Sequence, residues 1–368
     1  MSVVRIADKA PLVPLFTLSG QLGECSSVSL APPHLPELQN LLVSSDVAGC
    51  VYVWNLMAQS ILFTFHALDD VPTHYHTNHK LSSVLHAAFV AFEHPMALLL
   101  THCRSKAVFL WSVNFTEEQV SFVAAVPVRQ FAFCRAASFC RSSDVFIALP
   151  NDNDGVVFLH EANWSGGRWS EGTAKEINLA PSRCKVGQAM CLEFACNGTF
   201  LIAAYESGHC VVWDMTACII RCATRCFSEP AVACCGCWTV EGALLVAVSC
   251  AAGALHVYSL RTQAELLWES HHTSKGLGSL ACYVGRMGPV LVAAGWNGVA
   301  YMYNMSTGNR VAVLPYHEGS SMAGVALLDT SIAVPRFCNG CLDHQASNSL
   351  VLATCGSPVA LWQVNYTL

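Results

Sequence analysis

The sequence is poor in charge. Charged residues make up 12% of the 368-residue chain, and 19 Lys and Arg stand against 25 Asp and Glu, for a formal net charge of −6. No basic block occurs, so the composition excludes a protein that binds nucleic acid mainly through its phosphates. Hydrophobic residues make up 53% of the chain, and a chain with this much apolar surface to bury is not disordered as a whole.

The chain also lacks a recognisable export or membrane-spanning segment. Arg5, Asp8 and Lys9 interrupt the apolar residues near the N-terminus, whereas a signal peptide has a continuous apolar run. The uncharged stretch 242–259 contains Gly253, and it fits two strands joined by a turn better than one spanning helix. We therefore expect an intracellular, non-secreted protein of the nucleus or cytoplasm, whose 20 cysteines are reduced thiols.

Motifs of catalysis are missing as well. There is no Gly-x-Ser-x-Gly elbow, phosphate-binding glycine loop or His-Glu-x-x-His helix. Two clusters resemble metal ligands, but neither has further ligands at a familiar spacing. These clusters are His74, His76 and His79, and Cys338, Cys341 and His344. The sequence therefore predicts a protein that is not an enzyme and has no cofactor or metal, with the second cluster as a weak zinc candidate.

What the sequence does contain is a repeat. Each unit is an apolar strand, a short turn and a second strand that ends in a large side chain, in most units aromatic. The spacing of these anchors equals or exceeds the roughly 40–45 residues of a WD40 repeat. The anchors are Trp54, Trp111, Leu159, Trp213, Tyr258, Tyr303 and Trp362, and only Trp213 is followed by aspartate, at Asp214.

With a further apolar run upstream, each unit holds about four strands, which is the content of one propeller blade. The seven units predict an all-β fold, a seven-bladed WD40 β-propeller, with residues 1–368 as a single domain. Only six residues follow Trp362, too few for the last strand of blade seven. Because an open ring would expose unpaired strand edges, the segment from Val13 to Leu18 is predicted to supply that strand.

Three insertions interrupt the repeat. Residues 67–80 lie between blades one and two, residues 161–173 within blade three, and residues 329–348 within blade seven. Loops of this kind carry recognition in propellers while the scaffold stays rigid. Histidines that precede a following first strand (His66, His271 or His272, and His317) are expected to make buried structural hydrogen bonds.

The turns between second and third strands hold the candidate binding residues. They are Trp296, Asn297, Tyr205, Glu206, Asp46 and Asp154. Tryptophan and tyrosine are favoured anchors of protein interfaces, so we expect these turns to form a partner-binding face. The alternative, equally open at this point, is that the aromatic rings pack between blades.

Two pairs of segments resemble the ASTRA-associated protein 1 / guanine nucleotide-binding protein subunit β-like protein 1 family. Residues 190–192 and 201–214 resemble one signature blade of the family, and residues 293–297 and 311–317 resemble its penultimate blade. The resemblance implies a non-catalytic subunit tied to the ASTRA assembly and to the TTT co-chaperone components that mature phosphatidylinositol-3-kinase-related kinases (PIKK).

Other functions of a propeller remain open. The chain could recognise substrates for a ubiquitin ligase or act as an adaptor of a trafficking coat, and the residues do not decide between these partners. An enzymatic propeller would need acidic or histidine groups converging in the central channel. The predicted inner strands offer mainly apolar residues and cysteine there.

Overall fold

The computed structural model describes the chain with the following exceptions: residues 1–13, 15, 22, 33–34, 70, 76–82, 105–106, 129–133, 182–183, 240, 262, 273–275, 286–287, 319, 330–348, 357 and 366–368. Strands make up almost all the regular structure that it describes. Two short 3-10 helices accompany them, η1 (Pro36–Leu38) and η2 (Thr73–Tyr75).

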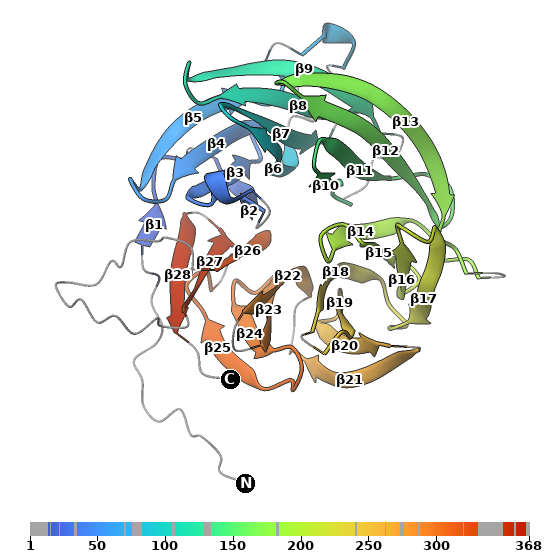
Figure 1. Ribbon diagram of the computed structural model, residues 1–368. Helices are drawn as coiled ribbons and strands as arrows, with labels where there is room; N and C mark the ends of the chain where they lie inside the picture. The colour runs from blue at the N-terminus through green and yellow to red at the C-terminus, as the bar shows by residue number, and fades with distance from the viewer. Residues whose placement is uncertain are drawn as a thin grey trace.

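The strands form seven four-stranded antiparallel sheets arranged in a ring (Figure 1). Blade one contains β2 (Cys25–Leu30), β3 (Leu41–Asp46), β4 (Cys50–Asn55) and β5 (Ser60–His66). Blade two contains β6 (Val84–Glu93), β7 (Met96–Cys103), β8 (Ala107–Asn114) and β9 (Gln119–Pro127). Blade three contains β10 (Ala137–Arg141), β11 (Asp144–Pro150), β12 (Val156–Ser165) and β13 (Arg168–Asn178).

The remaining blades repeat this order. Blade four contains β14 (Ala189–Ala195), β15 (Phe200–Tyr205), β16 (His209–Asp214) and β17 (Ile219–Arg225). Blade five contains β18 (Ala231–Trp238), β19 (Leu244–Cys250), β20 (Ala254–Leu260) and β21 (Ala264–His271). Blade six contains β22 (Leu277–Gly285), β23 (Gly288–Gly295), β24 (Ala300–Asn304) and β25 (Arg310–Leu314). Blade seven contains β26 (Gly324–Asp329), β27 (Ser349–Cys355), β28 (Val359–Asn365) and β1 (Phe16–Leu18).

Blade seven closes the ring with both ends of the chain. Its strand order is β1-β28-β27-β26, so the N-terminal strand forms the outer edge of the last blade. Phe16 lies opposite Leu361 and Leu18 opposite Val359 in the antiparallel register. The predicted closure by the N-terminal segment is therefore confirmed, with the strand beginning at Phe16; Val13 lies outside the described residues. Both predictions, seven blades and a ring closed in this way, are confirmed.

Every predicted anchor lies on the third strand of its blade, so the repeat in the sequence corresponds to one position in the fold. Trp54, Trp111 and Trp362 are almost fully buried, and so are Leu159, Tyr258 and Tyr303. Trp213 is only partly buried. Because these strands lie inside the sheets with blades on both faces, they read as nearly continuous apolar runs.

The polar residue after an anchor has its own structural role. Oδ1 of Asp214 accepts hydrogen bonds from the backbone N–H groups two and three residues further on, at 2.9 and 2.8 Å. Asn55 and Asn304 make the same pair of bonds in blades one and six. Such side chains mimic a backbone turn, and here they fix the turn into the outer strand.

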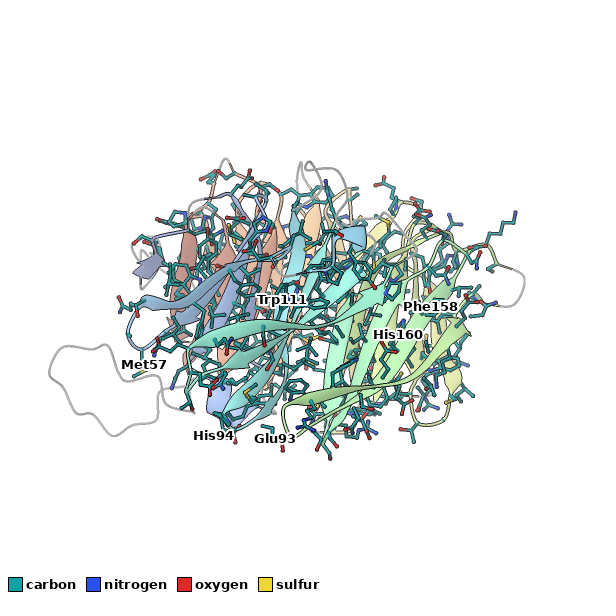
Figure 2. The ribbon with its side chains drawn as sticks, turned by 90° about the horizontal axis from the view of Figure 1, so that it is seen from above. Met57, Glu93, His94, Trp111, Phe158 and His160 are labelled. Carbon is teal, nitrogen blue, oxygen red and sulfur yellow. The ribbon has the colours of Figure 1, made fainter. Side chains whose placement is uncertain are left out.

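The predicted insertion at residues 161–173 does not form a separate loop. It lengthens β12 and β13 into one long hairpin, whose tip lies beneath blade two (Figure 2). There the backbone N–H of Gly166 donates to Oε2 of Glu93 at 2.6 Å. Of the other two predicted insertions, residues 76–80 and 330–348 lie outside the described residues.

Candidate protein-interaction surface

One end of the ring carries the turns between second and third strands and the loops between blades; we call it the turn face. Its backbone is tied together in a repeated way. In four blades the turn glycine, at positive φ, accepts a hydrogen bond from the first residue after the outer strand. The pairs are Ala67–Gly49, Leu179–Gly155 and Cys226–Gly208, each at 2.8 Å, and His272–Gly253 at 3.0 Å. The turn face is therefore a rigid platform for side chains.

Both carboxylate oxygens of Asp46, a predicted binding residue, accept hydrogen bonds from groups of its own blade. Its Oδ1 accepts hydrogen bonds from the backbone N–H groups of Ala48 and Cys50 at 3.0 and 2.8 Å. Its Oδ2 accepts from the Tyr52 hydroxyl at 3.0 Å. Since the side chain is also buried, Asp46 cannot contact a partner and its predicted binding role is wrong.

Asp154 and Glu206 are exposed but hold the loop that leads into blade four. Oδ1 of Asp154 accepts from the backbone N–H groups of Val186 and Gly187 at 2.9 and 2.6 Å. Oε2 of Glu206 accepts from the N–H of Gln188 at 3.0 Å. The other carboxylate oxygen of each residue takes no part in these bonds. Any contact of Asp154 or Glu206 with a partner therefore comes in addition to holding this loop.

Tyr205 is 0% exposed. It ends β15, where its ring enters the core between blades three and four, and its hydroxyl donates to the carbonyl of Gly155 at 3.3 Å. The prediction that Tyr205 helps to form a binding face is therefore wrong, because its aromatic side chain is buried in the core between two blades.

Trp296 is different, because its side chain is 37% exposed on the turn of blade six. The indole lies directly over Gly276 and Gly278, where any Cβ would overlap its ring atoms. Asn297, the next residue, is used inside the turn: it accepts from the Val299 N–H and donates to the Tyr301 hydroxyl. Two glycines thus make room for a flat aromatic ring held at the surface, which is how interface anchors are presented.

Other exposed apolar side chains stand on the same face. Tyr316, in the loop between blades six and seven, is 45% exposed, and Val47, in the turn of blade one, is 48% exposed. Neither residue was among the predicted binding residues, although Val47 follows the predicted residue Asp46 directly. Exposed apolar side chains therefore occur on the turn face in blade six, in the loop between blades six and seven, and in blade one.

The predicted buried structural hydrogen bond of a histidine is seen most fully at His317, which contacts blade seven. Nε2 of His317 lies 2.9 Å from Oγ1 of Thr354, which also accepts from Nε1 of Trp362 at 3.1 Å. His66 bonds the carbonyl of Ala48 at 3.0 Å, and His272 bonds the Tyr303 hydroxyl at 2.8 Å. His317 is buried, while His66 and His272 are only partly buried. All three hydrogen bonds join separate structural elements.

The inner strands contain more polar chemistry than the sequence analysis expected. Glu193 on β14 is an exposed carboxylate, and His86 stands on β6. Arg135, just before β10, donates to the carbonyl groups of Ser26 and Ala323 on the far side of the ring. These contacts tie blade three to blades one and seven.

His102, on β7, gives the fold a pH dependence. Burial and the nearby Arg135 lower the pKa of this imidazole from 6.5 to about 4, and its Nδ1 accepts from the Ala136 N–H at 2.9 Å, which a protonated Nδ1 cannot do. The unfolded chain takes up a proton near pH 6.5 and the folded chain only near pH 4. Between these values the His102 imidazole alone should lower the free energy of unfolding by about 1.4 kcal/mol per unit decrease in pH.

Urea titrations between pH 7 and pH 4 measure this slope. His102→Gln should make it shallower, whereas His271→Gln, which changes an exposed imidazole, should leave it as it is. An unchanged slope in the His102 variant would assign the pH dependence to other groups.

The comparisons with known proteins agree with this architecture. No protein-family model matches the sequence. Guanine nucleotide-binding protein subunit beta-like protein 1 of Mus musculus is 24% identical over 315 residues, which cover 84% of this chain and 88% of that protein. The β-propeller domain of Cps50 (Swd1) from Myceliophteria thermophila matches with a TM-score of 0.64 and 14% identity, over 96% of this chain and 100% of that one. The chain is a seven-bladed β-propeller.

Two further properties of the propeller concern its described residues. None of the helices in that part of the chain has the length and hydrophobicity that crossing a bilayer requires. The same part holds no group of three or more His, Cys, Asp or Glu side chains placed to bind a metal ion. The weak zinc candidates Cys338, Cys341 and His344 lie outside the described residues, as do His76 and His79.

A small cavity opens on the side of the propeller between blades two and three. Its volume is about 120 Å³, and Pro127, Pro150, Phe158 and His160 line it. Figure 2 shows Phe158 and His160 on the outer side of blade three, where their rings stack at 5.6 Å. Nothing in the sequence pattern distinguished these four residues, because the cavity arises only where two blades meet.

Proposed function

We propose that this propeller is a non-catalytic scaffold that binds a partner protein on the turn face, with Trp296 as the anchor. The exposed indole above Gly276 and Gly278 carries the proposal. A ring held in place before binding loses little conformational freedom on binding, and a large apolar contact of this kind dominates interface energetics. Tyr316 and Val47 extend the apolar contact area on the same face.

Two buried thiols of the propeller, Cys103 and Cys140, support a structural role over a catalytic one for these residues. Burial raises the pKa of Cys103 to about 12 and the pKa of Cys140 to about 11. Such cysteines stay protonated at neutral pH, and a protonated thiol is neither a good nucleophile nor a good metal ligand. Their place in the cores of the blades accounts for them.

For the assembly, we propose membership in an ASTRA-like complex that serves chromatin or the maturation of PIK-related kinases in the nucleus or cytoplasm, with residues 1–368 acting as one domain. The resemblance of residues 201–214 and 293–297 to family blades supports this assignment, and so does the similarity to guanine nucleotide-binding protein subunit beta-like protein 1. The alternative is a substrate-recognition propeller of a ubiquitin ligase or a trafficking-coat adaptor.

Affinity purification of the tagged protein from its own cells, followed by mass spectrometry, separates these assemblies. Recovery of ASTRA, TTT or PIK-related kinase subunits is expected. Recovery of cullin or coat subunits instead, without any of the expected ones, would refute the ASTRA assignment and leave the scaffold proposal standing.

Trp296→Ala tests the binding face itself. Removing an interface anchor costs about 2 kcal/mol or more, so the affinity for the purified partner should fall by about 30-fold or more. Trp238 offers a matched control: it is 40% exposed, but it ends the first strand of blade five and therefore lies at the opposite end of the ring. Trp238→Ala should bind as the wild type does. Full binding by folded Trp296→Ala would exclude Trp296 as the anchor.

A further inference from the structure

A pair of thiols spans the junction at which the ring closes. Cys25 begins β2 of blade one, and Cys355 ends β27 of blade seven, 330 residues further along the chain. Their sulfur atoms lie 2.8 Å apart. A disulfide bond measures about 2.05 Å, so the two sulfurs need to approach by less than about 1 Å to form one.

A cation lies beside this pair. The guanidinium of Arg135 reaches across the ring and donates to the carbonyl oxygens of Ser26, at 3.5 Å, and of Ala323, at 2.5 Å. Ser26 is the residue after Cys25, and the backbone N–H of Ala323 donates to the carbonyl of Cys355 at 3.1 Å. Positive charge next to a thiol favours the thiolate, which is the reactive form.

The two thiols are not equivalent. Burial, together with the hydrogen bond to Cys25, raises the pKa of Cys355, so this thiol keeps its proton at neutral pH. Cys355 is completely buried, whereas Cys25 retains slight exposure. The first reaction with a small oxidant therefore belongs to Cys25.

We propose that Cys25 and Cys355 form an oxidation site, at which a hydroperoxide converts the two thiols into a disulfide that joins blade seven to blade one. The Cys25 sulfur attacks one oxygen of hydrogen peroxide and loses its proton, the O–O bond breaks, and the departing hydroxide takes up that proton to become water. The resulting Cys25 sulfenic acid is then attacked by the Cys355 sulfur. The S–O bond breaks, the Cys355 proton leaves with the oxygen as a second water, and the S–S bond forms.

The location gives this bond a consequence for the fold. Without this disulfide, the outer edge of blade seven is closed by β1, which pairs with β28 through three of the described residues. A cross-link between residues so far apart in sequence removes much of the chain entropy of the unfolded state. Oxidation is therefore expected to lock the ring, which goes beyond the scaffold function proposed above.

The test treats the purified full-length protein with hydrogen peroxide and maps its peptides by mass spectrometry without reduction. We expect a cross-linked pair of peptides containing Cys25 and Cys355, lighter than the separate peptides by two hydrogens and released by dithiothreitol. The thermal unfolding midpoint should rise by about 5 °C on oxidation and return on reduction. Cys25→Ser should lack both changes.

Controls come from the same chain. Cys103→Ser removes a buried thiol of blade two and should keep the cross-link and the shift. Arg135→Gln should form the cross-link several-fold more slowly. Other thiols are hydrogen bonded across blades, such as Cys191 with Cys234, and the peptide map distinguishes them. A folded wild-type protein whose other cysteines oxidise while Cys25 and Cys355 stay unlinked would overturn the proposal, even if the variants fail to fold.

Discussion

Replacing Trp111 with alanine is expected to lower the free energy of unfolding by about 3–5 kcal/mol. The ring is 2% exposed on the third strand of blade two (Figure 2). It packs against Phe65 of blade one at 4.9 Å and Phe122 of its own blade at 5.8 Å, measured between ring centroids. Its Nε1 donates to Oγ1 of Thr101 at 2.9 Å. The substitution leaves a cavity at the junction of two blades and removes the hydrogen bond that Thr101 accepts.

Chemical denaturation with urea measures the loss, and Trp213 provides the matched control. It occupies the same anchor position in blade four but is only partly buried, so Trp213→Ala should cost clearly less. Thr101→Val separates the hydrogen bond from the volume effect and should cost about 1 kcal/mol. Equal losses for the two tryptophan variants would mean that burial of the anchor does not determine its contribution.

Leu18→Asp is expected to open the ring. Leu18 is 2% exposed on β1, where its side chain belongs to a core cluster with Trp54, Val359 and Leu361. The substitution removes about 2 kcal/mol of apolar burial and places a carboxylate among apolar groups, so the total cost should reach about 4 kcal/mol or more. The unfolding midpoint should fall, and protease should cleave near the N-terminus while the other blades remain folded.

Thr17→Asp is the control for this variant, because Thr17 lies on the same three-residue strand but is only partly buried. It should change stability by less than about 1 kcal/mol, since a surface substitution rarely costs more. If Leu18→Asp were as stable as Thr17→Asp, the pairing of β1 with β28 would contribute nothing to closure of the ring.

The candidate binding residues show where sequence reasoning reaches its limit. All six were chosen from turn positions, and the turns are where the sequence places them. The sequence does not say whether a turn side chain points outward. Asp46 bonds its own turn and Tyr205 enters the core, so two side chains expected on the surface are buried. Trp296 stays exposed only because Gly276 and Gly278, in a neighbouring strand and loop, leave room for it outside.

The sequence by itself determined the repeat, the number of blades and the closing strand. These follow from local patterns: an apolar run, a turn with glycine, an anchor and a polar residue that caps the next turn, each repeated along the chain. The pairing of β1 with β28 followed from counting the residues left after Trp362. Such features can be predicted because they depend only on residues that are close in sequence, or on the requirement that no strand edge be left unpaired.

Only the tertiary structure decided which surfaces are available and which distant groups meet. The contact of Cys25 with Cys355, the reach of Arg135 across the ring and the cavity beside Phe158 join residues from different blades. No local pattern encodes these contacts, because they depend on the angle at which each blade meets the others. Closure of the ring fixes those angles, so these contacts between blades are determined only when all seven blades are assembled.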